Sequence, residues 1–378
     1  MKIAAMKEIH EGEKRIPLIP ATVDKLVKLG AQVEVESGIG LTCRYGDTDY
    51  EKAGATVNSD RKALLGSADI VLRLRKPPLD EVELMKKGCI HISYLDPFNE
   101  LELVEKLKEC RISAVSLEML PRSTIAQKMD ALSSQANLGG YVAVMIAAER
   151  LDKIFPMMTT PAGTIKPSRV FIIGVGVAGL QAIATARRLG ARVEAFDTRP
   201  VVEEQVKSLG AKFVKIDLGE TGQTKDGYAT QLTAEQLQRQ KEGMAKACAQ
   251  ADVVITTAQL FGRPAPRIVD RGMLAGMQPG SVVVDMAVES GGNVEGSEVD
   301  KIVEIEGVNV IGLANLPGRV AATASQMYSS NLGNFLDHFW DKEAKIFNLD
   351  LDDELIKGAL MTHNGEIFSE TYKSIMKK

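Results

Sequence analysis

The sequence has few cysteines, few histidines and no long apolar run. Its four cysteines (Cys43, Cys89, Cys110, Cys248) include no C-x-x-C pair, which argues against disulfides and structural zinc and suits a reducing cytoplasm. The four histidines are dispersed, so we expect no metal site. The longest purely apolar stretch, 141–148, is far shorter than the roughly 20 residues that a spanning helix requires. We therefore expect no direct membrane insertion.

A strong charge of either sign is also missing. The formal net charge is −4 and 25% of the residues are charged, without the clustered basic excess that binding to nucleic acid needs. We therefore expect no nucleic-acid partner. At 378 residues the chain is too long for one compact core, so two domains are expected.

Strands and helices alternate in both halves of the chain, which predicts parallel sheets and an α/β fold. In the first half we expect strands at 2–6, 32–36, 70–74, 90–93 and 112–116, with helices at 21–29, 81–87 and 100–110. In the second half we expect strands at 169–173, 192–196, 212–216, 253–256, 282–285 and 309–311, with helices at 178–189, 202–209 and 234–249. Six strands make a complete dinucleotide-binding fold.

Between the halves, 131–151 is predicted to form one long helix, and the proline-rich segment 155–169 a loop. A final helix at about 324–340 needs a partner surface and is expected to pack back on the first domain. The predicted architecture is two Rossmann-like domains with parallel sheets, joined by a long bridging helix, with a cofactor in the interdomain cleft. The first domain would contain 1–135 and 325–378, and the second 136–324.

A glycine fingerprint opens the second domain. The G-x-G-x-x-G pattern lies between an apolar strand and a helix, and consists of Gly174, Val175, Gly176, Val177, Ala178 and Gly179. The first glycine permits a tight turn, the second lets a pyrophosphate approach the backbone, and the third allows close helix–strand packing. The alternative is a glycine turn that serves packing alone.

An acidic residue follows at the end of the next strand. Asp197 can accept hydrogen bonds from both hydroxyls of the adenosine ribose and would repel the 2′-phosphate of NADP, so it favours NAD(H). Arg199 lies two positions on, where it could contact a phosphate instead. Thr198, Arg199 and Ala258 complete the candidate cofactor-binding set. The alternative for Asp197 is an ordinary surface carboxylate.

Two polar segments are candidates for chemistry. In the segment 119–135, an arginine (Arg122) and an aspartate (Asp130) could hold the oxygen and the NH₂ group of a nicotinamide carboxamide. Asp130 also lies where a helix N-cap would be, so a purely structural role stays open. The glycine-rich segment 217–233 contains Tyr228 and has the length of a lid, the alternative being a disordered connection.

These motifs together resemble the NAD(H)-binding domain I of proton-translocating nicotinamide nucleotide transhydrogenase. The resemblance runs from Lys2 to about Trp340, and its most specific segments are 121–138, 175–186, 287–293 and 315–322. It implies that Arg122, Asp130 and Ser133 orient the nicotinamide and that Gln127 reaches the partner's nucleotide. It also implies that Tyr228 belongs to a mobile loop over the nucleotide and that Asp197 binds the adenosine ribose.

The resemblance implies an enzyme that passes hydride directly from NADH to NADP⁺ held on a separate domain III. The expected partners are a second copy of the chain, the NADP(H)-binding domain III and the membrane-spanning domain II. The expected location is cytoplasmic, at the cytoplasmic face of a bacterial inner membrane. Whether the chain is a natural subunit or an excised domain stays open.

Two other functions are weighed against this one. Alanine dehydrogenases share the fold and the Lys7-Glu8…Arg15 pattern, but carry a substrate-binding lysine where this chain has Arg75 and a catalytic histidine where it has Asp96. An aspartate at its ordinary acidity is a poor proton exchanger near neutral pH. A non-catalytic NAD-sensing module would keep the glycine turn but has no need of the 119–135 loop.

Overall fold

The computed structural model describes residues 1–219, 221, 232–259 and 262–376, and it divides the chain into two compact units. Unit 1 consists of Met1–Gln135 and Gly318–Lys378, and unit 2 of Ala136–Pro317. The chain returns to unit 1 earlier than the predicted residue 325. The reason is that α11 (Ala321–His338) is hydrogen-bonded to the rest of unit 1 from its first turns, since Ser325 Oγ accepts from Ile16 N at 2.9 Å.

Among the described residues, eight strands form the sheet of unit 1, in the order β19-β18-β6-β5-β4-β1-β2-β3. The strands β1 to β6 pair in parallel, and β18 and β19 are antiparallel at one edge. Their bounds are β1 Lys2–Ala5, β2 Gln32–Glu36, β3 Thr56–Asn58, β4 Ile70–Leu72, β5 Ile90–Ser93, β6 Ser113–Ser116, β18 Leu360–His363 and β19 Glu366–Ile367.

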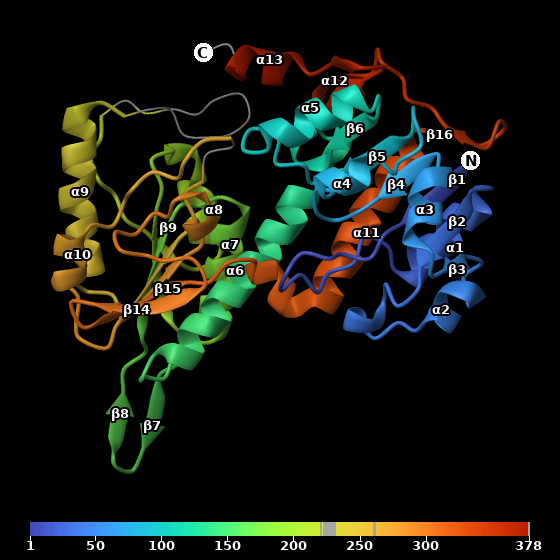
Figure 1. Cartoon of the computed structure of the whole chain (residues 1–378). Coiled ribbons are helices and arrows are strands. Elements are labelled where there is room, and N and C mark those ends of the chain that lie inside the picture. Colours follow the sequence, from blue (N-terminus) through green and yellow to red (C-terminus); the bar gives the residue numbers. More distant parts are fainter. Residues whose placement is uncertain (220, 222–231, 260–261, 377–378) are drawn as a thin grey trace. The chain divides into compact units, whose positions relative to one another are not determined.

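Both faces of this sheet are covered by helices, because alternate side chains of each strand point to opposite faces. On β1, Ile3 and Ala5 join the core that includes α1 and α11, whereas Ala4 joins the core that includes α3 and α5 (Figure 1). The helices of unit 1 besides α6 and α11 are α1 Pro20–Lys28, α2 Asp47–Lys52, α3 Arg61–Ser67, α4 Leu79–Val82, α5 Leu101–Glu109, α12 Glu354–Ala359 and α13 Glu370–Met376.

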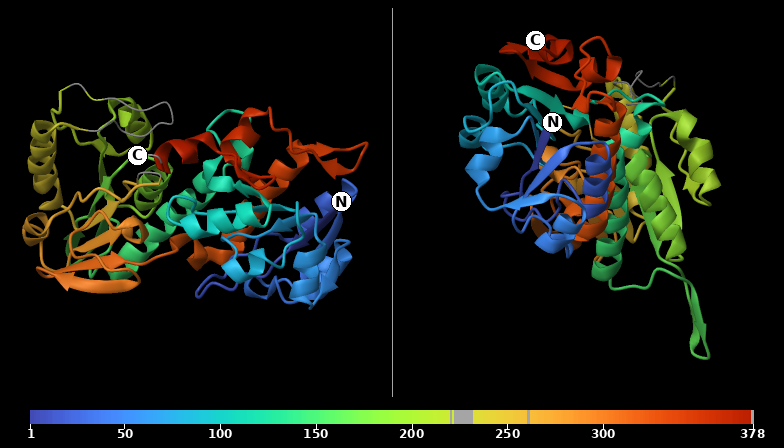
Figure 2. Two further views of the ribbon diagram at one scale, coloured as in Figure 1. Left: turned by 45° about the horizontal axis from the view of Figure 1, so that its top comes forward. Right: turned by 90° about the vertical axis from the view of Figure 1, so that its right-hand side faces the viewer.

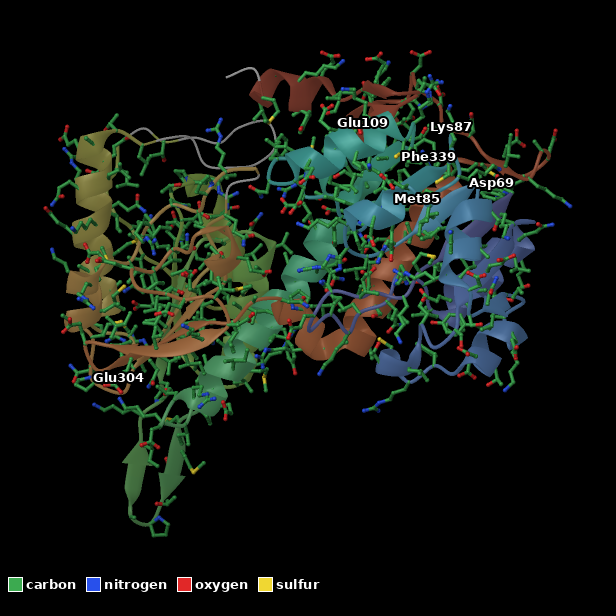
Figure 3. All side chains as sticks on the ribbon, viewed as in Figure 1. Asp69, Met85, Lys87, Glu109, Glu304 and Phe339 are labelled. Atoms are coloured by element: carbon green, nitrogen blue, oxygen red, sulfur yellow. The ribbon has the colours of Figure 1, made fainter. Side chains whose placement is uncertain are left out.

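The tail of the chain packs on unit 1, as predicted for its large apolar residues. Phe339, which follows α11, contacts the rings of Phe335 and Phe347 at centroid distances of 5.2 and 5.9 Å (Figure 3). The next residue, Trp340, donates from Nε1 to Leu29 O at 2.9 Å. A short ladder of β16 (Trp340–Asp341) and β17 (Ile346–Phe347) continues this packing.

The sheet of unit 2 contains, within the described ranges, seven strands in the order β11-β10-β9-β12-β13-β15-β14. All pair in parallel except β14, which is antiparallel to β15. Their bounds are β9 Arg169–Ile173, β10 Arg192–Phe196, β11 Lys212–Phe213, β12 Val253–Thr256, β13 Val282–Asp285, β14 Lys301–Ile305 and β15 Val308–Gly312. The α/β class with parallel sheets is thereby confirmed, with an added antiparallel strand at an edge of each sheet.

Helices also cover the sheet of unit 2. One face packs on α9 (Ala234–Cys248) and α10 (Arg271–Ala275) through a continuous apolar core (Figure 1). The helix α7 (Val177–Arg188) packs against β9, β10 and β12, and is followed along the chain by α8 (Glu203–Ser208). The long helix α6 (Ala131–Arg150) approaches α7 so closely that a methyl group on Gly140 would lie 2.2 Å from Ala178 O.

Four predicted elements differ from the structure. The segment 155–169 is not only a loop, because β7 (Met158–Thr160) and β8 (Gly163–Ile165) form a fully exposed hairpin that projects from unit 2 (Figure 2). The helix expected at 81–87 ends at Val82, where the chain turns so that Lys86 N donates to Leu65 O. The strand expected at 212–216 is shorter, and unit 2 has a strand, β14, that was not predicted. In the stretches of the chain that the structure describes, no helix combines the length and apolarity needed to cross a membrane.

Candidate functional site

The glycine fingerprint forms the turn between β9 and α7 in unit 2. Gly174 has a φ of +95°, which favours glycine, and a methyl group there would lie 2.6 Å from Thr257 Oγ1. A methyl group at Gly179 would lie only 1.9 Å from Gly174 O, so this glycine lets α7 begin directly against the turn. Around Gly176, the N-cap of α7, a methyl group would meet nothing within 4 Å. The space over Gly176 is therefore open, at a helix N-terminus whose N–H groups suit an anion.

Two substitutions separate these roles. We expect Gly179→Ala to lower the stability of unit 2 by about 1–3 kcal/mol, because the added methyl group overpacks the turn. We expect Gly176→Ala to leave stability within about 0.5 kcal/mol, because the site is open and its φ of −86° is ordinary. The same methyl group would keep a pyrophosphate from the backbone and weaken NADH binding about tenfold or more. Thermal unfolding and NADH titration measure the two effects, and normal NADH affinity in Gly176→Ala would contradict the assignment.

The turn lies where the strand order reverses. The chain runs from β9 to β10 and β11 on one side and from β12 to β13 on the other, and ligands bind at the carboxyl ends of such strands. Ala258, just beyond β12, is locked there by Asn293, which accepts from Ala258 N at 3.1 Å and donates to Ala258 O at 2.8 Å. The fully buried Asp285 in turn accepts from Asn293 N at 3.1 Å. The 287–293 motif therefore has a structural function: it fixes the strand end beside the glycine turn.

Asp197 follows β10 and faces the glycine turn. Its Oδ2 atom accepts from Val175 N at 2.8 Å, so the carboxylate and the turn hold each other in place. Arg199 pairs with the same carboxylate, with Nη2 2.7 Å from Oδ2 and Nε 2.9 Å from Oδ1. Asp197 raises the pKa of the Arg199 guanidinium above its usual value. Thr198 accepts from Thr221 Oγ1 through its backbone oxygen at 2.7 Å, so this strand end is anchored on both sides.

In unit 1, the segment 119–135 is a firmly anchored loop. Ala126 and Met129, in the short helix η3 (Ala126–Met129), are buried in the core, while the side chains of Arg122 and Gln127 are exposed. The backbone oxygen of Lys128 accepts from the side-chain amides of Asn331 and Asn334 on α11, at 3.0 and 3.1 Å. The loop is thus held from behind and presents polar groups outward.

Asp130 and Ser133 are brought together at the start of α6. Asp130 Oδ1 accepts from Ser133 N at 2.8 Å, which is the N-cap contact expected of the structural alternative. Its Oδ2 atom accepts from Ser133 Oγ at 2.5 Å. Capping uses one carboxylate oxygen, and the other aligns the hydroxyl of Ser133. The structural role is therefore present, and it leaves room for the functional one.

A buried ion pair that the sequence analysis did not find holds this helix start. The Arg15 guanidinium donates to Glu13 through Nε at 2.8 Å and Nη2 at 2.7 Å, and its Nη1 donates to Gln135 Oε1 at 2.9 Å. Gln135 also donates from Nε2 to Ala324 O on α11 at 2.9 Å. Close by, burial raises the pKa of Tyr94 far above its usual value, so its phenol stays neutral. Only the E-x-R spacing of Glu13 and Arg15 was visible in the sequence.

The two positions that distinguish alanine dehydrogenases have local partners here. Arg75 Nε lies 3.7 Å from Glu13 Oε2, next to the buried ion pair. Asp96 has a φ of +52°, and its carboxylate accepts from Asn99 Nδ2 at 2.7 Å and lies 3.6 Å from Lys76 Nζ. Asp96 thus stabilises a turn. Neither position carries a proton donor or acceptor suited to neutral pH.

Two further expectations concern the lid and metals. Tyr228 lies outside the described residues. Within the described ranges, no group of three or more histidine, cysteine, aspartate or glutamate side chains is arranged to hold a metal ion.

Two α/β units, one with a glycine turn at the reversal of its strand order, define a protein of the Rossmann-fold class. The family model described as alanine dehydrogenase/PNT, N-terminal domain, matches residues 4–139, and the corresponding C-terminal domain model matches 143–370. The first of the separate chains of the NAD(P) transhydrogenase alpha subunit of Rhodospirillum rubrum is 44% identical over 374 residues, which cover 97% of each chain. The chain belongs to the alanine dehydrogenase/PNT family and, within it, to the NAD(P) transhydrogenase alpha subunits.

Solved structures agree with this placement. A crystal structure of transhydrogenase from Sinorhizobium meliloti superposes with a TM-score of 0.87 at 44% identity, and covers 97% of this chain and 100% of that one. A structure of L-alanine dehydrogenase has a TM-score of 0.82 at 27% identity, and covers 100% and 99%. The fold is therefore shared by both branches of the family, and the higher identity lies with the transhydrogenases.

Proposed function

We propose that this chain is the NAD(H)-binding component of a proton-translocating NAD(P) transhydrogenase, an oxidoreductase that passes hydride from NADH to NADP⁺ held on a partner domain. The observation that supports this most is the glycine turn at Gly174–Gly179 with the Asp197 carboxylate bound to its backbone at 2.8 Å. The membership of the chain among the transhydrogenase alpha subunits gives this nucleotide site its reaction.

The residues present fit an NAD(H) molecule. The open space over Gly176 and the N-terminus of α7 suit a pyrophosphate, and the Asp197 carboxylate suits the diol of the adenosine ribose. At the nicotinamide end, we propose that Arg122, Asp130 and Ser133 hold the carboxamide and that Gln127 reaches the partner's nucleotide. Tyr228 is proposed to belong to a loop that closes over the nucleotide.

Catalysis by this chain would consist of positioning. The nicotinamide supplies the hydride when it is bound, and no proton has to be exchanged with an organic substrate. The anchored loop and the Asp130–Ser133 pair are suited to hold one ring in one orientation, and the approach of two well-oriented reactants contributes much of the acceleration in such a step. Water exclusion on assembly with the partner would protect the transfer.

The proposed partners are the NADP(H)-binding domain III, the membrane-spanning domain II and a second copy of this chain. These follow from the family, and they place the protein in the cytoplasm at the inner face of a bacterial membrane. The exposed hairpin β7–β8 supports the homodimer, because Met158 and Ile165 are 45% and 49% exposed and offer apolar surface to a second copy.

A mixing experiment tests the proposed function. The purified chain, combined with an NADP(H)-binding domain III, should transfer hydride from NADH to NADP⁺ or to an analogue with a distinct absorption. Neither component alone should do so. If the mixture shows no transfer although both nucleotides bind, the proposed reaction is wrong.

Pyruvate and ammonia provide the control for the second candidate, an amino-acid dehydrogenase of the alanine type. We expect no NADH oxidation with them, because Asp96 stabilises a turn and Arg75 lies beside Glu13. Rapid turnover of pyruvate and ammonia would favour the dehydrogenase instead. NADH binding without either reaction would leave the sensing module as the better interpretation.

A further inference from the structure

The Asp197 carboxylate is fully occupied in the structure. Its Oδ1 atom accepts from Arg199 N at 2.8 Å and from Arg199 Nε at 2.9 Å. Its Oδ2 atom accepts from Val175 N at 2.8 Å and from Arg199 Nη2 at 2.7 Å. A carboxylate offers about four lone-pair sites, and these four donors, all among the described residues, use them.

The four donors differ in whether they can leave. Two are backbone N–H groups, which the glycine turn and the end of β10 hold in place. The other two belong to the Arg199 side chain, whose Nη2 also donates to Val175 O at 3.1 Å. Rotation about the side-chain bonds of Arg199 frees both positions at once and leaves the carboxylate still fixed by its two backbone donors.

The adenosine ribose needs the positions that Arg199 fills. Its two hydroxyls donate to the carboxylate at the end of the second strand of a dinucleotide fold, which here is Asp197. We propose that Arg199 covers this ribose acceptor in the nucleotide-free protein, and that the ribose diol displaces its guanidinium when the nucleotide binds. This inference rests on the proposed NAD(H) site.

The displacement has a cost that lowers the apparent affinity. The pair is bidentate, and the side chains of Arg199 and Asp197 are only 15% and 7% exposed, so water screens it little. A protein whose binding-competent form is only a fraction of the population binds its ligand more weakly by that fraction. Arg199 therefore sets how strongly the site responds to a ribose diol.

A pair of nucleotides isolates this effect. AMP and 2′-deoxy-AMP differ only in one ribose hydroxyl, so any contact between Arg199 and a phosphate is the same for both. The readout is the ratio of their dissociation constants, measured by calorimetry or by competition with NADH fluorescence. In Arg199→Met we expect the preference for AMP over 2′-deoxy-AMP to rise about tenfold above that of the wild type, which corresponds to ~1.4 kcal/mol.

Two further variants control for indirect effects. Arg199→Lys keeps the charge but loses the two-pronged contact, so we expect a preference between those of the wild type and Arg199→Met. Asp197→Asn should reduce the preference to about one. Unchanged thermal unfolding of unit 2 in the presence of saturating NADH would show that Arg199→Met keeps the fold.

The outcomes separate this inference from the proposed function. A preference for AMP that stays the same or falls in Arg199→Met would overturn the inference, because Arg199 would then assist the ribose contact. No preference in the wild type and none in Arg199→Met would mean that Asp197 is not the ribose acceptor, and the nucleotide site itself would be wrongly assigned. Hydride transfer with domain III is a separate measurement and does not enter this test.

Discussion

Replacement of Asp130 by asparagine should slow hydride transfer to the partner's NADP⁺ by about 10²-fold while changing NADH binding much less. Asparagine keeps one side-chain oxygen for the N-cap contact with Ser133 N. It loses the second acceptor, which aligns the Ser133 hydroxyl at 2.5 Å and is proposed to receive the carboxamide NH₂ group. Single-turnover transfer in the mixed system measures the rate, and NADH titration measures the affinity.

A matched control separates capping from orientation. Asp60 caps α3 in the same way, since its side chain accepts from Ala63 N at 2.9 Å, and it lies outside the candidate site. Asp60→Asn should therefore leave both transfer and binding unchanged. If Asp130→Asn lost rate and affinity by equal factors, its role would be in binding and not in orientation.

Replacement of Arg15 by methionine should destabilise unit 1 by about 3–5 kcal/mol, because it removes one partner of a buried ion pair. The side chain of Glu13 is only 1% exposed, and it would lose its two guanidinium hydrogen bonds at 2.8 and 2.7 Å. Gln135 would lose a donor at the same time. The single tryptophan, Trp340, is buried in unit 1, so its fluorescence during denaturation reports on this unit alone.

Two controls test that charge burial is the cause. Arg239 and Glu235 form an exposed pair one turn apart on α9, and Arg239→Met should cost no more than about 0.5 kcal/mol. The double variant Glu13→Gln with Arg15→Met should recover much of the lost stability, because no unpaired charge stays buried. If the double variant were less stable than Arg15→Met, loss of packing and not loss of pairing would explain the effect.

The same pair predicts a dependence on pH. Burial by itself would raise the pKa of the Glu13 carboxyl, but hydrogen bonds and charge from Arg15, with the charge of Arg75, hold the pKa below its ordinary value of 4.5. A lowered pKa in the folded state stabilises the protein above the unfolded-state value and loses that contribution as the pH falls through the folded-state value. Arg15→Met should lack this acid-side loss.

Much of the fold could be predicted because its signals are local. Strands such as Arg169–Ile173 and Val282–Asp285 are short apolar runs between polar turns, and the structure has them with the same bounds. Two missed hairpins also had local signals. Asn364-Gly365 joins β18 to β19, and Glu306-Gly307 joins β14 to β15, with positive φ at all four residues.

The candidate site was predicted only partly. The glycine pattern and Asp197 lie on one strand–helix–strand unit, so their meeting follows from the spacing, and the structure shows them bonded at 2.8 Å. That Arg199 occupies the same carboxylate was not predicted, because the direction of a side chain two positions on depends on the turn after β10. The predicted phosphate contact of Arg199 is not tested by this structure.

The sequence by itself determined the α/β class, the glycine turn and the acid beside it, because each depends on residues close together in the chain. Tertiary structure alone decided how the 119–135 loop is held. Gln135 meets Arg15 across 120 positions of sequence, and Asn331 meets the loop at Lys128 across 203. Such contacts depend on where α11 returns to unit 1, and no local pattern records which buried polar groups will satisfy one another.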